Sequence, residues 1–149
     1  YLGASGGAGV GYGMSAAIGA ALALKDTGKL AVDIQSHGDL LMTSSSLWTA
    51  AKHRIPLLAV MHNNQSFYNS EEHGIEVAKF RKRPVENAGI GTHVDDPPVD
   101  YARLAESFGV QGIGPIRRPE EVQPALEKAR QYVQEKKLPV LVDVIAEPR

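Results

Sequence analysis

Two continuous apolar runs constrain the fold of this chain more than any other feature. They cover residues 56–61 and 138–145, and neither shows the regular apolar and polar alternation of a half-exposed strand. Such a run is typical of a strand that is covered on both faces, and strands of this kind occur mainly in parallel sheets. The sequence therefore predicts a parallel sheet with helices on both sides.

The rest of the chain alternates between helix and strand patterns. Two further short strands are predicted, at residues 30–35 and 110–113, and a broken helix is predicted at residues 71–80, followed by a long loop. The predicted helices are residues 14–25, 47–53, 100–108 and 119–137. This order indicates an α/β fold with a doubly wound parallel sheet and three α/β/α layers. The length of 149 residues predicts one domain, residues 1–149.

Composition narrows the class of protein. The 16 basic and 17 acidic residues give a net charge of -1, which does not favour a nucleic-acid or anionic-membrane partner. The absence of cysteine fits a reducing compartment, so we expect a cytoplasmic protein. No apolar run approaches the roughly 20 residues of a membrane span. Because the chain starts at Tyr1 and runs directly into a glycine-rich segment, it resembles a piece of a longer polypeptide.

Polar residues follow two of the predicted strands. Residues 36–39 read Ser-His-Gly-Asp, and residues 62–66 read His-Asn-Asn-Gln-Ser. In a doubly wound sheet, ligands bind beyond the carboxyl ends of the strands. If the two strands are neighbours, the oxygens of Asp39 and Asn64 converge, and such oxygens suit Mg²⁺ or Ca²⁺. The alternative is that Gly38-Asp39 is only a turn and Asn63-Asn64 only a loop.

A phosphate group is the expected third member of such a site, since Mg²⁺ completes its shell with water and ligand phosphates. The serine-rich start of the helix at residues 47–53 is expected to offer unpaired backbone N–H groups to it. Glycines at positions 6, 7, 9, 11 and 13 would let the backbone approach a ligand closely. The alternatives for this segment are a flexible leader or a dinucleotide loop, but no strand precedes it as a dinucleotide fingerprint requires.

Taken in order, several segments resemble one known family. They are residues 9–21, Gly38-Asp39, residues 47–50, Ile55-Pro56 and Asn63-Asn64. Together they resemble the C-terminal diphosphate-binding domain of thiamine-diphosphate enzymes, in particular the acetolactate-synthase-like 2-oxoacid decarboxylases and carboligases. The resemblance covers nearly the whole chain.

The resemblance implies specific site residues. Asp39, Asn64 and the backbone carbonyl of Ser66 are implied as Mg²⁺ ligands. Val10 is implied to support the bent cofactor, and the Ala8 carbonyl to accept a hydrogen bond from its aminopyrimidine. The implied cofactor-binding set is Ala8, Gly9, Val10, Gly38, Asp39, Leu40, Leu41 and Asn64.

The chain departs from the family pattern at the segments that are implied to bind the metal and the diphosphate. Family members usually read Gly-Asp-Gly-Ser where this chain reads Gly-Asp-Leu-Leu at residues 38–41, and the linker to the asparagine pair is about two residues shorter. Ser15 replaces a usual proline, and Val10 is smaller than the usual residue. These differences concern the affinity for the cofactor rather than the fold.

The resemblance also implies an activity and partners. We expect cleavage or formation of a C–C bond on a small 2-oxo acid, with thiamine diphosphate and Mg²⁺ as cofactors. The activating glutamate is expected on a pyrimidine-binding domain outside this chain, so the catalytic residues are unknown here. The chain is therefore expected to be inert alone, as a fragment of a longer enzyme or as the small subunit of a two-chain 2-oxoacid decarboxylase. The full enzyme is expected to be a homodimer or homotetramer. A non-catalytic homologue that uses the fold for assembly is the alternative.

Other side chains admit two interpretations. His37 and His62 flank the proposed ligands, where each is either a proton shuttle or a packed or capping histidine. Trp48 lies on an apolar helix face, and core packing is the simplest expectation. The resemblance does not assign Glu71 or Glu72 a role.

Overall fold

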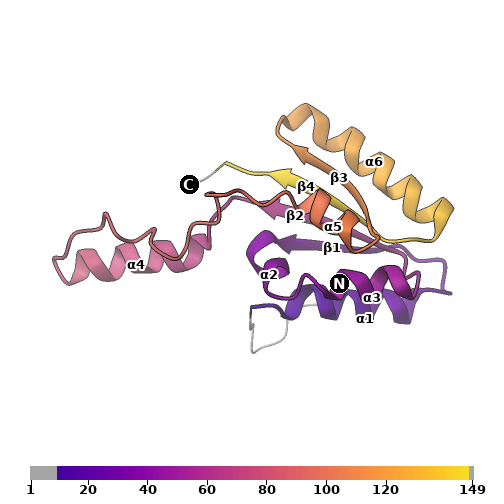
Figure 1. Ribbon diagram of the computed structural model, residues 1–149, viewed down its shortest axis with the longest axis horizontal. Helices are drawn as coiled ribbons and strands as arrows, with labels where there is room; N and C mark the ends of the chain where they lie inside the picture. Colours follow the sequence, from indigo (N-terminus) through magenta and orange to yellow (C-terminus); the bar gives the residue numbers. More distant parts are fainter. Residues whose placement is uncertain (1–9, 148–149) are drawn as a thin grey trace.

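The computed structural model describes residues 10–147 of the chain, and these residues form one parallel sheet with helices on both faces (Figure 1). The sheet has four strands in the order β1-β2-β4-β3, and every pair is parallel. The strands are β1 (Ala31–Ser36), β2 (Leu57–Asn63), β3 (Gln111–Ile116) and β4 (Val140–Ile145). The two apolar runs are the central strands β2 and β4, as their composition predicts.

The described part of the chain contains six helices. They are α1 (Tyr12–Leu24), α2 (His37–Met42), α3 (Ser46–Lys52), α4 (Tyr68–Phe80), α5 (Tyr101–Ser107) and α6 (Pro119–Lys136). One buried cluster joins α1, α2, α3 and α5 to alternate residues of β2, including Leu57 and Met61, while a second joins α6 to Leu58 and Val142. The α/β/α layering is therefore confirmed. Among the described residues, no helix is both long and apolar enough to span a membrane.

The structure differs from the sequence-based expectation at two helices. Residues 37–42 form the short helix α2, because Leu40 turns inward and is completely buried. Helix α4 is continuous through Gly74 and not broken as expected. This helix has no buried residue and projects away from the sheet (Figure 1).

The expectation that Trp48 packs in the core is wrong. Its side chain is 53% exposed, and the Lys52 ammonium lies 5.2 Å from the ring centroid. Leu47 and Ala50 fill the buried face of α3 instead, so the indole lies on the outer side of the same short helix. A helix of two turns buries only one narrow stripe, and Trp48 falls outside it.

Candidate functional site

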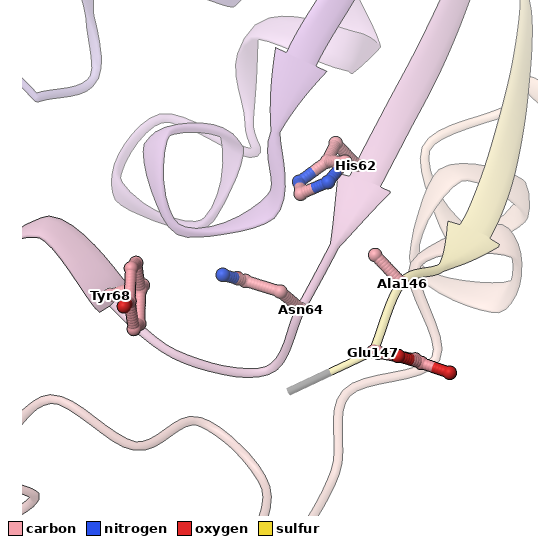
Figure 2. A pocket seen from close by; sticks show the side chains of 5 residues that line it. All are labelled: His62, Asn64, Tyr68, Ala146 and Glu147. Atoms are coloured by element: carbon pink, nitrogen blue, oxygen red, sulfur yellow. The ribbon is translucent and has the colours of Figure 1, made fainter. Parts of the chain in front are cut away.

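The candidate site lies where β1, β2 and β4 end together. Ser36 pairs with His62, and Asn63 pairs with Ile145, so the residues that follow these strands share one edge of the sheet. A cavity of ≈ 560 Å³ opens at this edge. Its lining residues are His62, Asn64, Tyr68, Ala146 and Glu147 (Figure 2). The strand ends therefore meet at a cavity, as expected for a doubly wound sheet.

The two adjacent asparagines have different roles. Asn63 is 1% exposed; its amide nitrogen donates to Asp143 Oδ1 at 3.1 Å, and its backbone carbonyl accepts from Ala146 N at 2.9 Å. It therefore ties β2 to β4. Asn64 is only partly buried, and its side chain points from the end of β2 toward Tyr68 (Figure 2). Of the pair, Asn64 is the one available to a ligand.

The turn after Asn64 leaves a backbone oxygen available. Gln65 has a φ of 57°, and Ser66 N donates to Asn64 Oδ1 at 3.4 Å. Ser66 also forms an antiparallel bridge with His93. The hydrogen bonds beside this bridge run from Phe67 N and Val94 N and do not involve the Ser66 carbonyl. Asn64 and the Ser66 carbonyl thus fit the predicted oxygen ligands on the β2 side.

A polar contact fastens the following loop to α4. Ser66 Oγ donates to Glu71 Oε2 at 2.7 Å, and His93 Nε2 lies 3.2 Å from Glu71 Oε1. The hydrogen bond from Ser66, and then the one from His93, lower the pKa of Glu71, so this side chain is an ionised acceptor at neutral pH. Through its contact with His93, Glu71 holds the loop of residues 89–95 beside the N-terminal end of α4.

Asp39 makes its hydrogen bonds inside the chain. Its Oδ1 accepts from Gly11 N at 2.5 Å, its Oδ2 accepts from Gly13 N at 3.0 Å, and the side-chain amide of Gln35 also donates to Oδ2. These amides belong to the glycine turn that begins α1, where a carboxylate is favoured by the helix dipole. Gly13 leaves room for this contact, because a Cβ there would lie 2.6 Å from Asp39 Oδ2.

His37 is packed, which supports the packing interpretation for this residue. It is 2% exposed, its ring lies 5.8 Å from that of Tyr101, and Nδ1 lies 3.3 Å from the His62 carbonyl oxygen. A carbonyl can only accept, so Nδ1 carries the hydrogen, and Nε2 is buried without a partner. Burial lowers the pKa of His37. His62, in contrast, is exposed and lines the cavity.

The other predicted cofactor-binding residues fall into three groups. Ala8 and Gly9 lie outside the described residues, whereas Val10 is 62% exposed at the glycine turn and Leu41 is 37% exposed. Leu40 has a completely buried side chain, so only its backbone could contact a ligand. The structure does not test these binding roles, which stay predictions.

The expectation of unpaired amides at the serine-rich helix start is wrong. The N–H groups of Ser46, Leu47 and Trp48 donate to the carbonyls of residues 43–45 at 2.9 to 3.1 Å. Residues 43–45 form turns that run into α3, and their carbonyls accept from the first three amides of the helix, which would otherwise be unpaired. A phosphate would therefore need other donors.

Sequence reasoning missed part of the site. Tyr68, Ala146 and Glu147 line the cavity because of how the chain leaves β2 and β4, and no local pattern marks them. Asp143 was detectable, since it is a single acid within the apolar run of β4. It is completely buried, and that burial raises its pKa.

A half-buried acid close to Asp39, Asp33 in β1, gives the first testable prediction. Burial, and then the charge of Asp39, raise the pKa of Asp33 from 3.8 to about 6, and its Oδ2 has no partner. Because the folded pKa lies above the unfolded one, stability falls as pH rises from about 4 to about 6 and is level above that range. Asp33→Asn should remove this slope and stabilise the protein above pH 6 by about 1 kcal/mol, a small gain because Asp33 is partly solvated.

Thermal unfolding of wild type and Asp33→Asn from pH 4 to pH 8 would measure this effect. Asp26→Asn, at an exposed position after α1, is the matched control and should leave the pH profile unchanged. Parallel profiles for wild type and Asp33→Asn would contradict the prediction.

The comparison with known families decides what kind of domain carries this site. The model described as "Thiamine pyrophosphate enzyme, C-terminal TPP binding domain" matches residues 1–144. The chain belongs to this family. The resemblance stated from the sequence is thus confirmed, and thiamine pyrophosphate, also called thiamine diphosphate, is the cofactor of the family.

Relatives of this thiamine-diphosphate-binding domain are enzymes. The chain is 34% identical over 148 residues to the mitochondrial acetolactate synthase catalytic subunit of Aspergillus candidus, covering 92% of this chain and 19% of that protein. It is 28% identical over 140 residues to glyoxylate carboligase of Escherichia coli O157:H7, covering 93% and 23%. The chain therefore spans about a fifth of the length of these relatives.

The fold is also similar to that of a solved decarboxylase. The 4-hydroxybenzoylformate decarboxylase of Rhodococcus jostii RHA1, described as thiamine diphosphate-dependent, matches with a TM-score of 0.71 and 24% identity. The match covers 93% of this chain and 23% of that structure. At this identity the likeness shows the fold alone, which is the same α/β architecture.

Proposed function

We propose that this chain supplies the diphosphate-binding half of an enzyme that cleaves or forms a C–C bond on a small 2-oxo acid. The family match over residues 1–144 carries the proposal. The enzymatic relatives named above support this reaction class, and the cavity at the ends of β2 and β4 supplies a location. Decarboxylation and carboligation share the same carbanion chemistry, so both belong to the proposed class.

The residues at the sheet edge fit the cofactor in part. Bound thiamine diphosphate supplies a carbon that adds to the 2-oxo group and stabilises the carbanion. Val10, exposed at the glycine turn, would support the cofactor from below, while Asn64 and the Ser66 carbonyl would face its charged end. Glu71 would keep the adjoining loop of residues 89–95 in place.

Magnesium dependence is part of the proposal, although only the residues that follow β2 fit the implied set of metal ligands. Asn64 Oδ1 and the Ser66 carbonyl are oxygens of the kind that Mg²⁺ prefers. Asp39 does not fit as the third protein ligand, because its carboxylate is directed to the glycine turn at the start of α1, where it accepts hydrogen bonds from Gly11 N, Gly13 N and the side-chain amide of Gln35. No catalytic step is assigned to the metal.

We further propose that the active assembly needs a pyrimidine-binding domain, on the same polypeptide or on a separate subunit, and that the complete enzyme is a homodimer or homotetramer. The chain covers about a fifth of its relatives, 19% of the Aspergillus protein, which leaves room for such a domain in those proteins. This chain alone is expected to show no turnover.

Calorimetric titration of the complete protein with thiamine diphosphate, with and without Mg²⁺, tests the proposal. We expect saturable binding that Mg²⁺ strengthens and that Asn64→Ala weakens by about 10-fold or more, as for loss of a residue at a metal site. Release of CO₂ from a panel of 2-oxo acids would then identify the reaction. Absence of cofactor binding would refute the proposal.

A second candidate is a homologue without catalytic activity that keeps the fold for assembly. Two observations favour it. Asp39 accepts hydrogen bonds from the glycine turn, and the first amides of α3 already donate to backbone carbonyls. Cofactor binding together with turnover of any 2-oxo acid by the complete protein would exclude this alternative.

A further inference from the structure

The two departures from the family motif have one explanation. One comparison places Gly38-Asp39 on the first two residues of the family motif Gly-Asp-Gly-Ser. Two leucines then replace Gly-Ser, and the segment between the motif and Asn63-Asn64 is about two residues shorter than in the family. Moving the comparison back by two positions places residues 36–39, Ser-His-Gly-Asp, on that motif. The length difference disappears, and Gly38 then matches the second glycine. The residue at the metal-ligand position becomes His37.

Gly38 falls on a glycine of the motif in both comparisons, and the structure shows why a glycine suits this position. A Cβ there would lie 2.8 and 2.9 Å from the Cζ and Cδ1 atoms of the Phe67 ring, so a side chain would displace that ring. Phe67 follows directly after Ser66, and the contact thus joins the start of α2 to the loop that carries the β2-side oxygens.

Position 37 also has the right location. Ser36 is paired with His62 across β1 and β2, and His37 follows it directly. The contact of 3.3 Å between His37 Nδ1 and the His62 carbonyl holds position 37 beside the last residues of β2, just before the asparagine pair. Asp39 lies two residues further on, in α2, and its carboxylate is directed to α1.

Asp39 has a complete role in that direction. Gly11 has a φ of 94°, and both of its backbone polar groups are bonded to α2 or its C-cap. Its N–H donates to Asp39 in α2, and its carbonyl accepts from Oγ1 of Thr43, the C-cap residue, at 2.9 Å. The Asp39 carboxylate accepts from Gly13 N as well. A carboxylate with three such donors is satisfied without a cation. Asp39 and Thr43 together form what we call the glycine-turn lock.

We propose that Asp39 is a positioning residue of the glycine-turn lock, and that the position facing the cation from β1 is 37, which carries histidine in this chain. The inference rests on the proposed thiamine-diphosphate and Mg²⁺ site. Mg²⁺ prefers oxygen ligands, whereas imidazole suits softer metals such as Zn²⁺. Bound Mg²⁺ would therefore be held by Asn64 and the Ser66 carbonyl on the β2 side and by the diphosphate, with no carboxylate from β1.

Three substitutions in the complete protein test this assignment. Asp39→Asn places an amide N–H donor against one of the backbone N–H donors, so one hydrogen bond of the lock is lost, and Thr43→Ala removes another without touching any charge. His37→Asp places a carboxylate at the proposed ligand position. For each variant, calorimetry with thiamine diphosphate gives the Mg²⁺ concentration for half-maximal binding, and thermal unfolding without cofactor or cation gives the midpoint temperature.

We expect Asp39→Asn and Thr43→Ala to lower the midpoint without cofactor and to leave the Mg²⁺ requirement within about 3-fold of wild type. His37→Asp should lower the Mg²⁺ requirement by about 10-fold, the usual effect of a residue at a metal site. A rise of about 10-fold or more with Asp39→Asn, but not with Thr43→Ala, would overturn the assignment. So would a folded His37→Asp protein with an unchanged Mg²⁺ requirement.

The outcome separates this inference from the proposed function. If wild type binds no thiamine diphosphate at any Mg²⁺ concentration, the proposed function fails. The glycine-turn lock is then still judged by the unfolding midpoints, and unchanged midpoints for both Asp39→Asn and Thr43→Ala would refute it.

Discussion

Replacing Asn63 by alanine is expected to lower the free energy of unfolding by about 1 to 3 kcal/mol, the cost of leaving a buried polar group without its partner. Asn63 is 1% exposed and donates to Asp143 Oδ1 at 3.1 Å, and Asp143 is completely buried. Asp143 Oδ2 has no partner, so the variant would leave both oxygens without a side-chain donor. Denaturant unfolding of wild type and variant measures the difference.

Asn64 provides a matched control one position away. It has the same side chain but lies half-buried at the cavity, so Asn64→Ala should change the free energy of unfolding by no more than about 0.5 kcal/mol. The same variant should weaken thiamine-diphosphate binding, whereas Asn63→Ala should reduce it only through unfolding. Equal destabilisation by the two substitutions would contradict the division of roles between the two asparagines.

The sequence predicts that both asparagines lie near a ligand, but it does not predict which one faces it. Successive residues of a strand point to opposite faces, and only the pairing with β4 determines that Asn63 meets Asp143. These two residues lie 80 positions apart. The strand itself was predictable, because the apolar run of residues 56–61 needs no distant information.

The same limit applies to Asp39. A Gly-Asp pair after a strand fits a metal ligand, a turn and a helix cap equally well from its local sequence. Its partners, Gly11 and Gly13, lie 28 and 26 residues earlier, and only the packing of α1 against α2 brings them to the carboxylate. The helix α2 itself escaped prediction because its six residues are too few to show a helical period.

Alanine at Gly112 is expected to destabilise the domain by about 1 to 3 kcal/mol, the usual cost of an added methyl group in a filled space. Gly112 lies in β3 directly beneath α5. An added Cβ would collide with the backbone carbonyl oxygen of Ala102 and would lie 2.8 Å from its carbonyl carbon. Backbone atoms cannot rotate away as a side chain can, so the whole helix would have to shift.

That shift would also reach the candidate site. Tyr101 precedes Ala102 in α5, and its ring lies 5.8 Å from the ring of His37 at the end of β1. Gly19→Ala in α1 is the matched control, since no atom lies within 4 Å of its added Cβ, and alanine should stabilise that helix by about 0.5 to 1 kcal/mol. Denaturant unfolding should therefore move the two alanine variants in opposite directions. A Gly112→Ala protein as stable as wild type would show that α5 can move relative to β3 at little cost, and the contact between Tyr101 and His37 would then be more adaptable than its burial indicates.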